Sequence, residues 1–202
     1  METLLSPRKL RQSRGFTLLE VVGAVFILAF GLLGVAMLLS RLNVNTNQSR
    51  YMSDEALLAS EKLEDLNRYP IVDPAIVAGG SLTANVTQNN TVGAVTELVD
   101  YFDSVQISTG NGSSIEITTG TDSKGNPNYT QVTHTPNGGA QAQTIAGPPP
   151  APSPDMLVFN RRWIIEQDVP VVGVRRVTVS VTLNSVAAGP AATSFQSSMV
   201  RP

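Results

Sequence analysis

RGFTLLEVVGAV, residues 14–25, places the carboxylate of Glu20 directly before the longest apolar run of the chain. That run, Val21 to Leu39, holds nineteen residues without a charge. At about 1.5 Å per residue it forms roughly 30 Å of helix, enough to cross the hydrocarbon core of a membrane. Because residues 1–15 carry four cations against one acid, we expect them to stay in the cytoplasm and the rest of the chain to lie outside.

Two simpler hypotheses also fit a basic segment followed by an apolar one. A cleaved secretory signal is disfavoured, because its apolar region spans roughly 7–15 residues and because no small-x-small site occurs within residues 40–48. A plain single-pass anchor remains open, since hydrophobicity alone requires no processing. The position of Glu20 argues for more than an anchor. A carboxylate within lipid costs about 2.5–3.5 kcal/mol, so such residues usually have a partner or a function.

The small residues of the apolar run share a helix face with this acid. At about 100° per residue, Glu20, Gly23, Gly31 and Gly34 fall within an arc of about 80°. Small residues on one face allow helices to approach closely in an apolar medium, and a carboxylate there can meet a donor of the neighbouring helix. We therefore predict that this helix packs against other helices.

The segment GFTLLEVV, behind its basic leader, resembles the prepilin processing signature of type IV pilins and type II secretion pseudopilins. In that family, a membrane-embedded prepilin peptidase cuts after the glycine and methylates the new terminal amine. The resemblance implies a cut between Gly15 and Phe16, N-methylation of Phe16, and an assembly ion pair between Glu20 and the terminal amine of an adjacent subunit. It also implies residence in the bacterial inner membrane, as a single-pass protein with a cytoplasmic N-terminus, before transfer to a pilus or periplasmic pseudopilus.

The second half of the apolar run indicates which kind of pilin the chain resembles. AFGLLGVAMLL, Ala29 to Leu39, resembles the Gly-Leu-Leu-Gly segment of PilV-type minor pilins, and it lacks the proline of many major pilins. The preferred hypothesis is a structural minor pilin that serves assembly initiation, modification or adhesion, with prepilin peptidase and other pilin subunits as partners. A pseudopilin of a type II secretion system is the alternative. A membrane-anchored binding module that does not assemble is an alternative of another class.

Helical periodicity continues beyond the apolar run. Within residues 41–69, apolar side chains recur at three- and four-residue steps, at Tyr51, Met52, Ala56, Leu57, Leu58, Leu63 and Leu66. We expect this amphipathic continuation to end at Tyr69, before Pro70, and to bend or fray at Asn43–Ser49, which is poor in helix formers. The charged residues of its last turns are expected to form only a solvated face: Glu61, Lys62, Glu64, Asp65 and Arg68.

Residues 70–154 form a variable region rich in Thr, Asn, Gly and Pro. Its short alternating segments predict strands at Leu82–Thr87, Val92–Val99, Val105–Thr109, Ser114–Thr119 and Asn128–Thr133. The stretch GPPPAPSP, residues 147–154, predicts a stiff connector outside any sheet.

Residues 155–202 contain three strongly β-rich runs, MLVFNRRWIIEQD, VRRVTVSVTLN and TSFQSSMV, which predict antiparallel strands. This arrangement also resembles the C-terminal sheet of PilV-like minor pilins. The predicted fold is α+β: a long N-terminal helix, with a transmembrane half and an amphipathic half, packed against a C-terminal antiparallel β-sheet head, as in pilins.

Residues that could carry catalysis are sparse in this chain. It has no cysteine, and its one histidine, His134, stands in a turn-rich segment where we expect an exposed loop. Asp100 and Asp103, at a predicted strand end, and Asp122, in a predicted turn, lack the dense acidic spacing of a calcium loop. We therefore expect no enzymatic activity, no cofactor and no metal.

Two arginine pairs raise the question of nucleic acid binding, although the formal net charge is −2. Strand alternation should send one arginine of Arg161-Arg162 and one of Arg175-Arg176 to each face, so at most two share a surface. Pairing with carboxylates or protection of a sheet edge explains them better than contact with DNA. Trp163, between Arg162 and Ile164, is expected in a packed core or a subunit contact.

Overall fold

The computed structural model describes residues 16–108, 113–135, 137–184 and 194–201. The chain divides into two compact units, Met1–Thr46 and Asn47–Pro202, and helix α1 (Leu18–Arg68) continues from the first into the second. The predicted leader, including Gly15, lies outside the described residues.

Both ends of α1 follow from local sequence. Thr17 precedes the helix, and its hydroxyl oxygen accepts a hydrogen bond from the backbone N–H of Glu20 at 3.3 Å, as an N-cap residue does. The helix ends at Arg68, close to the predicted stop before Pro70. The fraying expected at Asn43–Ser49 is wrong, because α1 is continuously helical there. The hydroxyl of Thr46 donates to the carbonyl of Leu42 at 2.8 Å, so this polar side chain is satisfied within the helix.

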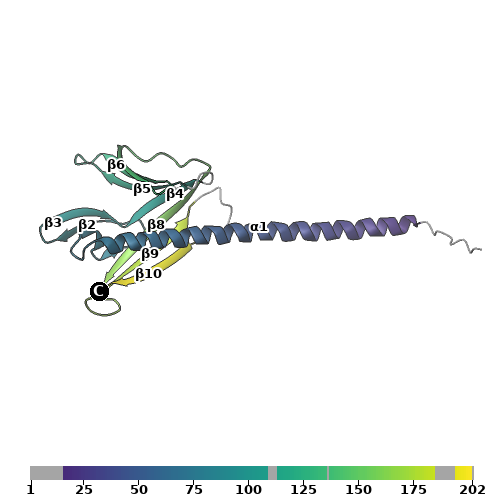
Figure 1. Ribbon diagram of the computed structural model, residues 1–202, viewed down its shortest axis with the longest axis horizontal. Helices are drawn as coiled ribbons and strands as arrows, with labels where there is room; N and C mark the ends of the chain where they lie inside the picture. Colours follow the sequence, from purple (N-terminus) through teal and green to yellow (C-terminus); the bar gives the residue numbers. More distant parts are fainter. Residues whose placement is uncertain (1–15, 109–112, 136, 185–193, 202) are drawn as a thin grey trace, which may run out of the picture. The chain divides into compact units, whose positions relative to one another are not determined.

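The remainder of the second unit is almost entirely β-structure, and every strand pair in its described part is antiparallel. The main sheet has the order β10-β9-β8-β4-β5-β6-β7, with β1 added to β8, while β2 and β3 form a separate hairpin (Figure 1). The bounds, which include the short helix η1, are η1 (Pro74–Ile76), β1 (Gly79–Gly80), β2 (Thr87–Val92), β3 (Val95–Asp100), β4 (Phe102–Ser108), β5 (Ser114–Thr121), β6 (Pro127–His134), β7 (Ala140–Ala146), β8 (Met156–Gln167), β9 (Arg175–Leu183) and β10 (Ser194–Arg201).

The strand predictions hold best where apolar alternation is strong. The three C-terminal runs are β8, β9 and β10, and Ser114–Thr119 and Asn128–Thr133 lie within β5 and β6. The strand predicted at Val105–Thr109 is β4, although Thr109 lies outside the described residues. The sequence did not show that β4 pairs with β8, which joins strands of the middle region and the C-terminal strands in one sheet.

One strand prediction is wrong, and another runs across a turn. The strands β1 and β7 were missed, as was β2 except for its end residues Thr87 and Val92. Leu82–Thr87 is irregular up to β2, because the Ser81 hydroxyl accepts hydrogen bonds from the backbone N–H groups of Thr83 and Ala84 and holds a local turn. The predicted strand Val92–Val99 is two strands, since Gly93 has a φ of 61° and turns the chain between β2 and β3. β7 was missed because its polar and small residues lack strong β-propensity.

The core of the second unit lies between one face of the main sheet and the last turns of α1. The buried apolar residues of this core, which include Ile76 of η1 and Tyr101 between β3 and β4, are Leu58, Ala59, Leu63, Leu66, Ile76, Tyr101, Val105, Leu157, Phe159, Trp163, Ile165, Val177, Val179 and Val181. Trp163 is therefore a core residue, one of the two roles expected for it. The long helix packed against an antiparallel sheet confirms the predicted pilin-like α+β fold.

The buried face of α1 differs in part from the predicted one. Leu57 is 68% exposed and Met52 is 44% exposed, whereas Glu55 and Ala59 are completely buried. The helix is rotated so that Leu58, rather than its neighbour Leu57, packs on the sheet.

Candidate assembly site

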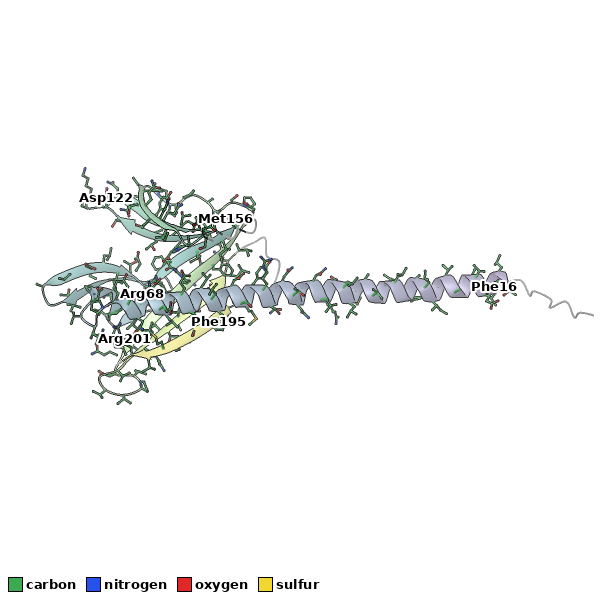
Figure 2. The ribbon with its side chains drawn as sticks, viewed as in Figure 1. Phe16, Arg68, Asp122, Met156, Phe195 and Arg201 are labelled. Carbon is green, nitrogen blue, oxygen red and sulfur yellow. The ribbon has the colours of Figure 1, made fainter. Side chains whose placement is uncertain are left out.

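The first part of α1 exposes an almost continuous apolar surface. Its large apolar side chains between Phe16 and Leu39 range from 45% exposed at Val22 to 84% exposed at Leu18, and Figure 2 shows them projecting around the helix. Within the described residues, α1 is the one helix long and apolar enough to cross a membrane, with a mean hydropathy of 2.7 over its best window. So large an apolar surface requires lipid or other apolar helices around it.

Of the described residues of the predicted assembly site, Glu20, Gly23, Gly31 and Gly34 lie on this helix, and Phe16 lies two residues before its start. Glu20 stands in the first turn, where the helix dipole favours an acid, and Phe16 lies four positions before it. A Cβ atom added to Gly23, Gly31 or Gly34 would meet no atom within 4 Å. Within a single chain these glycines have no close contact to accommodate, which leaves their face free for a neighbouring helix.

The second unit contains a buried ion-pair network that the sequence did not suggest. Asp103 on β4 lies directly opposite Arg161 on β8, and the two form a bidentate pair with N–O distances of 2.6 and 2.8 Å. The ammonium of Lys62, from α1, lies 2.8 Å from the same carboxylate. Three elements of the fold therefore meet at one buried carboxylate.

Further charges surround this carboxylate. Glu116 on β5 lies 2.7 Å from the Arg161 guanidinium and 3.5 Å from the Lys62 ammonium. The Lys62 ammonium also lies 4.2 Å from the centre of the Trp163 ring, within the range of a cation–π contact. The prediction that the helix charges form only a solvated face is therefore wrong for Lys62, because its side chain is mostly buried between α1 and the sheet.

The protonation of these groups follows from opposing effects. Burial alone would raise the pKa of Asp103, but the charges of Lys62 and Arg161 and their hydrogen bonds lower this pKa to about 2. Burial alone would lower the pKa of Arg161, but Asp103, Glu116 and Glu61 raise it above its ordinary value. Asp103 and Arg161 therefore both stay charged at neutral pH. The directional contacts of the network favour one register of α1 on the sheet.

The arginine pairs point to opposite faces of their strands, as expected. Arg161 faces the helix, while Arg162 on the other face donates its Nε to Asn85 at 2.8 Å. Arg176 pairs with Glu166 at 2.7 Å, and Arg175 donates to the carbonyl of Ile71 at 2.9 Å. Carboxylate pairing is thus confirmed for one arginine of each pair.

The structure also places the histidine and the aspartates that were considered as catalytic or metal-binding candidates. The prediction of an exposed loop is wrong for His134, which closes β6 and is only partly exposed, because β6 extends one residue beyond the predicted strand. Asp122 accepts hydrogen bonds from the backbone N–H groups of Lys124 and Asn126, which confirms the predicted turn. Asp100 ends β3, and Asp103 belongs to the network. No group of three or more potential metal ligands occurs in the part of the chain that the structure describes.

Comparison with known proteins identified one feature. Residues 10–36 match the family model of the prokaryotic N-terminal methylation motif. The match includes Gly15, Phe16, Glu20 and all three glycines of the apolar run. No curated protein and no solved structure matched the chain.

Proposed function

Because residues 10–36 match the prokaryotic N-terminal methylation motif, we propose that this chain is a type IV pilin-like protein, a minor pilin incorporated into a type IV pilus. The motif is typical of pilins and pseudopilins that prepilin peptidase processes, so the proposed role is structural rather than enzymatic. The observation that carries the proposal is the coincidence of the motif at residues 10–36 with an apolar, exposed helix that begins at Leu18. Such a helix suits anchoring in the inner membrane before assembly.

The proposed processing cuts the chain between Gly15 and Phe16 and methylates the new terminal amine of Phe16. Glu20 then stands as the fifth residue of the mature chain. In the fibre, the Glu20 carboxylate pairs with the terminal amine of an adjacent subunit. The ion pair with this amine offsets the free-energy cost of placing the Glu20 carboxylate in lipid. Gly23, Gly31 and Gly34, on the same arc, let the neighbouring helix approach closely.

The minor role is supported by two features of the apolar run. It contains the segment GLLG, residues 31–34, and no proline interrupts it. Within a pilus the subunit serves assembly initiation, modification or adhesion. The second candidate is a pseudopilin of a type II secretion system, because the same methylation motif occurs there. The genes next to its own discriminate between the two, since each machine has its own assembly components.

Mass spectrometry of the mature protein tests the processing. The expected N-terminal peptide begins at N-methyl-phenylalanine, Phe16, and disappears when prepilin peptidase is deleted. An intact Met1 terminus in cells with active peptidase would contradict the proposal and favour a plain membrane anchor.

Substitution of Glu20 tests the assembly contact. We expect Glu20→Ala to leave membrane insertion and processing intact but to reduce incorporation into sheared fibres at least tenfold. The ion pair with the adjacent amine is lost in this variant. Glu64→Ala, at an exposed position of the same helix, is the matched control and should assemble normally. Normal incorporation of Glu20→Ala would refute the proposed pairing.

A further inference from the structure

A groove of about 360 Å³ lies on the face of the main sheet opposite α1. Its floor comes from β4, β5 and β8, which are neighbours in the sheet (Figure 1). Its wall is the proline-rich connector, through Pro149, Pro150 and Pro152. The floor residues Phe102 and Ser104 alternate along β4 with Asp103 and Val105, which face the helix. The groove is therefore separate from the core and from the ion-pair network.

Strand register places polar groups side by side on this floor. Ser104 lies opposite Asn160 of β8 on one side and opposite Ile117 of β5 on the other. Gln106, two residues further along β4, lies opposite Val158. Neighbouring strands are about 4.8 Å apart. The hydroxyl of Ser104 and the amides of Asn160 and Gln106 thus lie beside apolar side chains. They cover an area comparable to that of one small cyclic molecule.

Among the described residues that line the groove, none offers a free charged side chain to a ligand. The one ionisable residue that lines it is Asp103, and both of its carboxylate oxygens are bonded to Arg161 and Lys62 on the other face of the sheet. A ligand that carries phosphate, carboxylate or ammonium groups would lose its hydration without a compensating ion pair. The chemistry of the groove therefore favours a neutral ligand.

The polar groups that remain are amides and hydroxyls, from Asn85, Ser104, Gln106, Thr119, Asn160 and Asn184. An amide both donates and accepts hydrogen bonds, as does each hydroxyl of a sugar. Arg162 donates to Oδ1 of Asn85, which orients this amide at the rim. Phe102, Val158 and the proline rings supply apolar surface for the C–H groups of a sugar ring.

From these observations, we propose that the groove binds a neutral carbohydrate. The proline wall is stiff, because each proline fixes its own φ. The wall therefore loses little conformational entropy when a ligand binds. The inference supplies a ligand class for an adhesive role, but it requires only the folded second unit. It does not rest on cleavage, methylation or assembly. A failure of either proposal therefore leaves the other standing.

The test is a glycan array that carries neutral oligosaccharides of hexoses and N-acetylhexosamines beside sialylated and sulfated ones. The full-length chain is applied in a zwitterionic detergent, because sugar-based detergents would compete for the groove. We expect saturable binding to a subset of the neutral glycans. Ser104→Ala and Asn160→Ala should each weaken that binding about tenfold, since each removes a hydrogen-bonding group.

Asn89→Ala, at an exposed position of β2 outside the groove, is the matched control and should bind as the unmodified protein does. Thr119→Arg is a second groove variant. Because Thr119 is exposed, the substitution blocks the groove without disturbing the core, and it should abolish binding while the thermal unfolding midpoint is unchanged. Absence of binding to every neutral glycan, a preference for the anionic glycans, or unchanged binding by Thr119→Arg would each overturn the proposal.

Discussion

Asp103→Asn is the sharpest perturbation of the network that joins α1 to the sheet. It removes one charge from the carboxylate that contacts Arg161 at 2.6 Å and Lys62 at 2.8 Å, and it leaves the shape of the side chain nearly unchanged. Breaking a buried ion pair by neutralising one partner costs about 3–5 kcal/mol. Because Glu116 still lies 2.7 Å from Arg161, we expect a loss near the lower limit, about 3 kcal/mol of unfolding free energy.

The pH dependence of this loss is a stricter test. The folded-state pKa of Asp103 is about 2, below the ordinary value of 3.8. A carboxyl whose pKa is depressed by folding stabilises the protein fully above its unfolded-state pKa, and this contribution falls as the pH decreases towards the folded-state pKa. The difference in unfolding free energy between the wild type and Asp103→Asn should therefore be constant above about pH 5 and shrink by about 2 kcal/mol towards pH 2.

Urea unfolding followed by tryptophan fluorescence measures both quantities. The chain has one tryptophan, and Trp163 is buried beneath Lys62 in the second unit, so its emission reports on that unit alone and not on the apolar helix in detergent. Glu64→Gln, at an exposed position of α1, is the control and should change stability by less than about 0.5 kcal/mol. A loss below about 1 kcal/mol for Asp103→Asn, or a difference that does not vary between pH 5 and pH 2, would refute the reasoning.

Two further predictions use neighbouring or matched positions, with the same urea assay. Leu58→Ala should cost about 2–5 kcal/mol because Leu58 is 4% exposed, whereas Leu57→Ala should be nearly neutral at 68% exposed; equal losses would mean that α1 packs through another face. Gly80→Ala should cost more than Gly93→Ala. Both glycines have positive φ, but only at Gly80 would the new Cβ collide with the Trp163 carbonyl. A larger loss for Gly93→Ala would contradict this contact.

Helix α1 shows which structural features the local sequence pattern can predict. Its start, its apolar half and its end near Pro70 are local properties, and each was predictable from neighbouring residues. Its buried face was predicted only in part, because Leu57 and Leu58 are adjacent and either could face a core. The sheet decided between them by packing Leu58 and Ala59 against its surface. The fraying expected at Asn43–Ser49 failed for a related reason, since weak helix propensity is easily overridden.

The sheet also had features that local patterns predict and others that they do not. Alternating valines identified β9, but alternation carries no information about which strand lies beside another. The pairing of β4 with β8 unites the middle region with the C-terminal strands. This pairing also creates the groove floor on one face and places Asp103 opposite Arg161 on the other.

By itself, the sequence determined the membrane-length helix, the acid in its first turn and the methylation motif, because all three depend on residues close together in the chain. Only the tertiary structure decided that Lys62 is a buried partner of the sheet rather than a solvated charge. It also brought together Asp103 and Arg161, which are 58 positions apart in the sequence. An ion pair at that separation depends on strand order and register, and these are set by the packing of the whole sheet against α1 rather than by any local pattern.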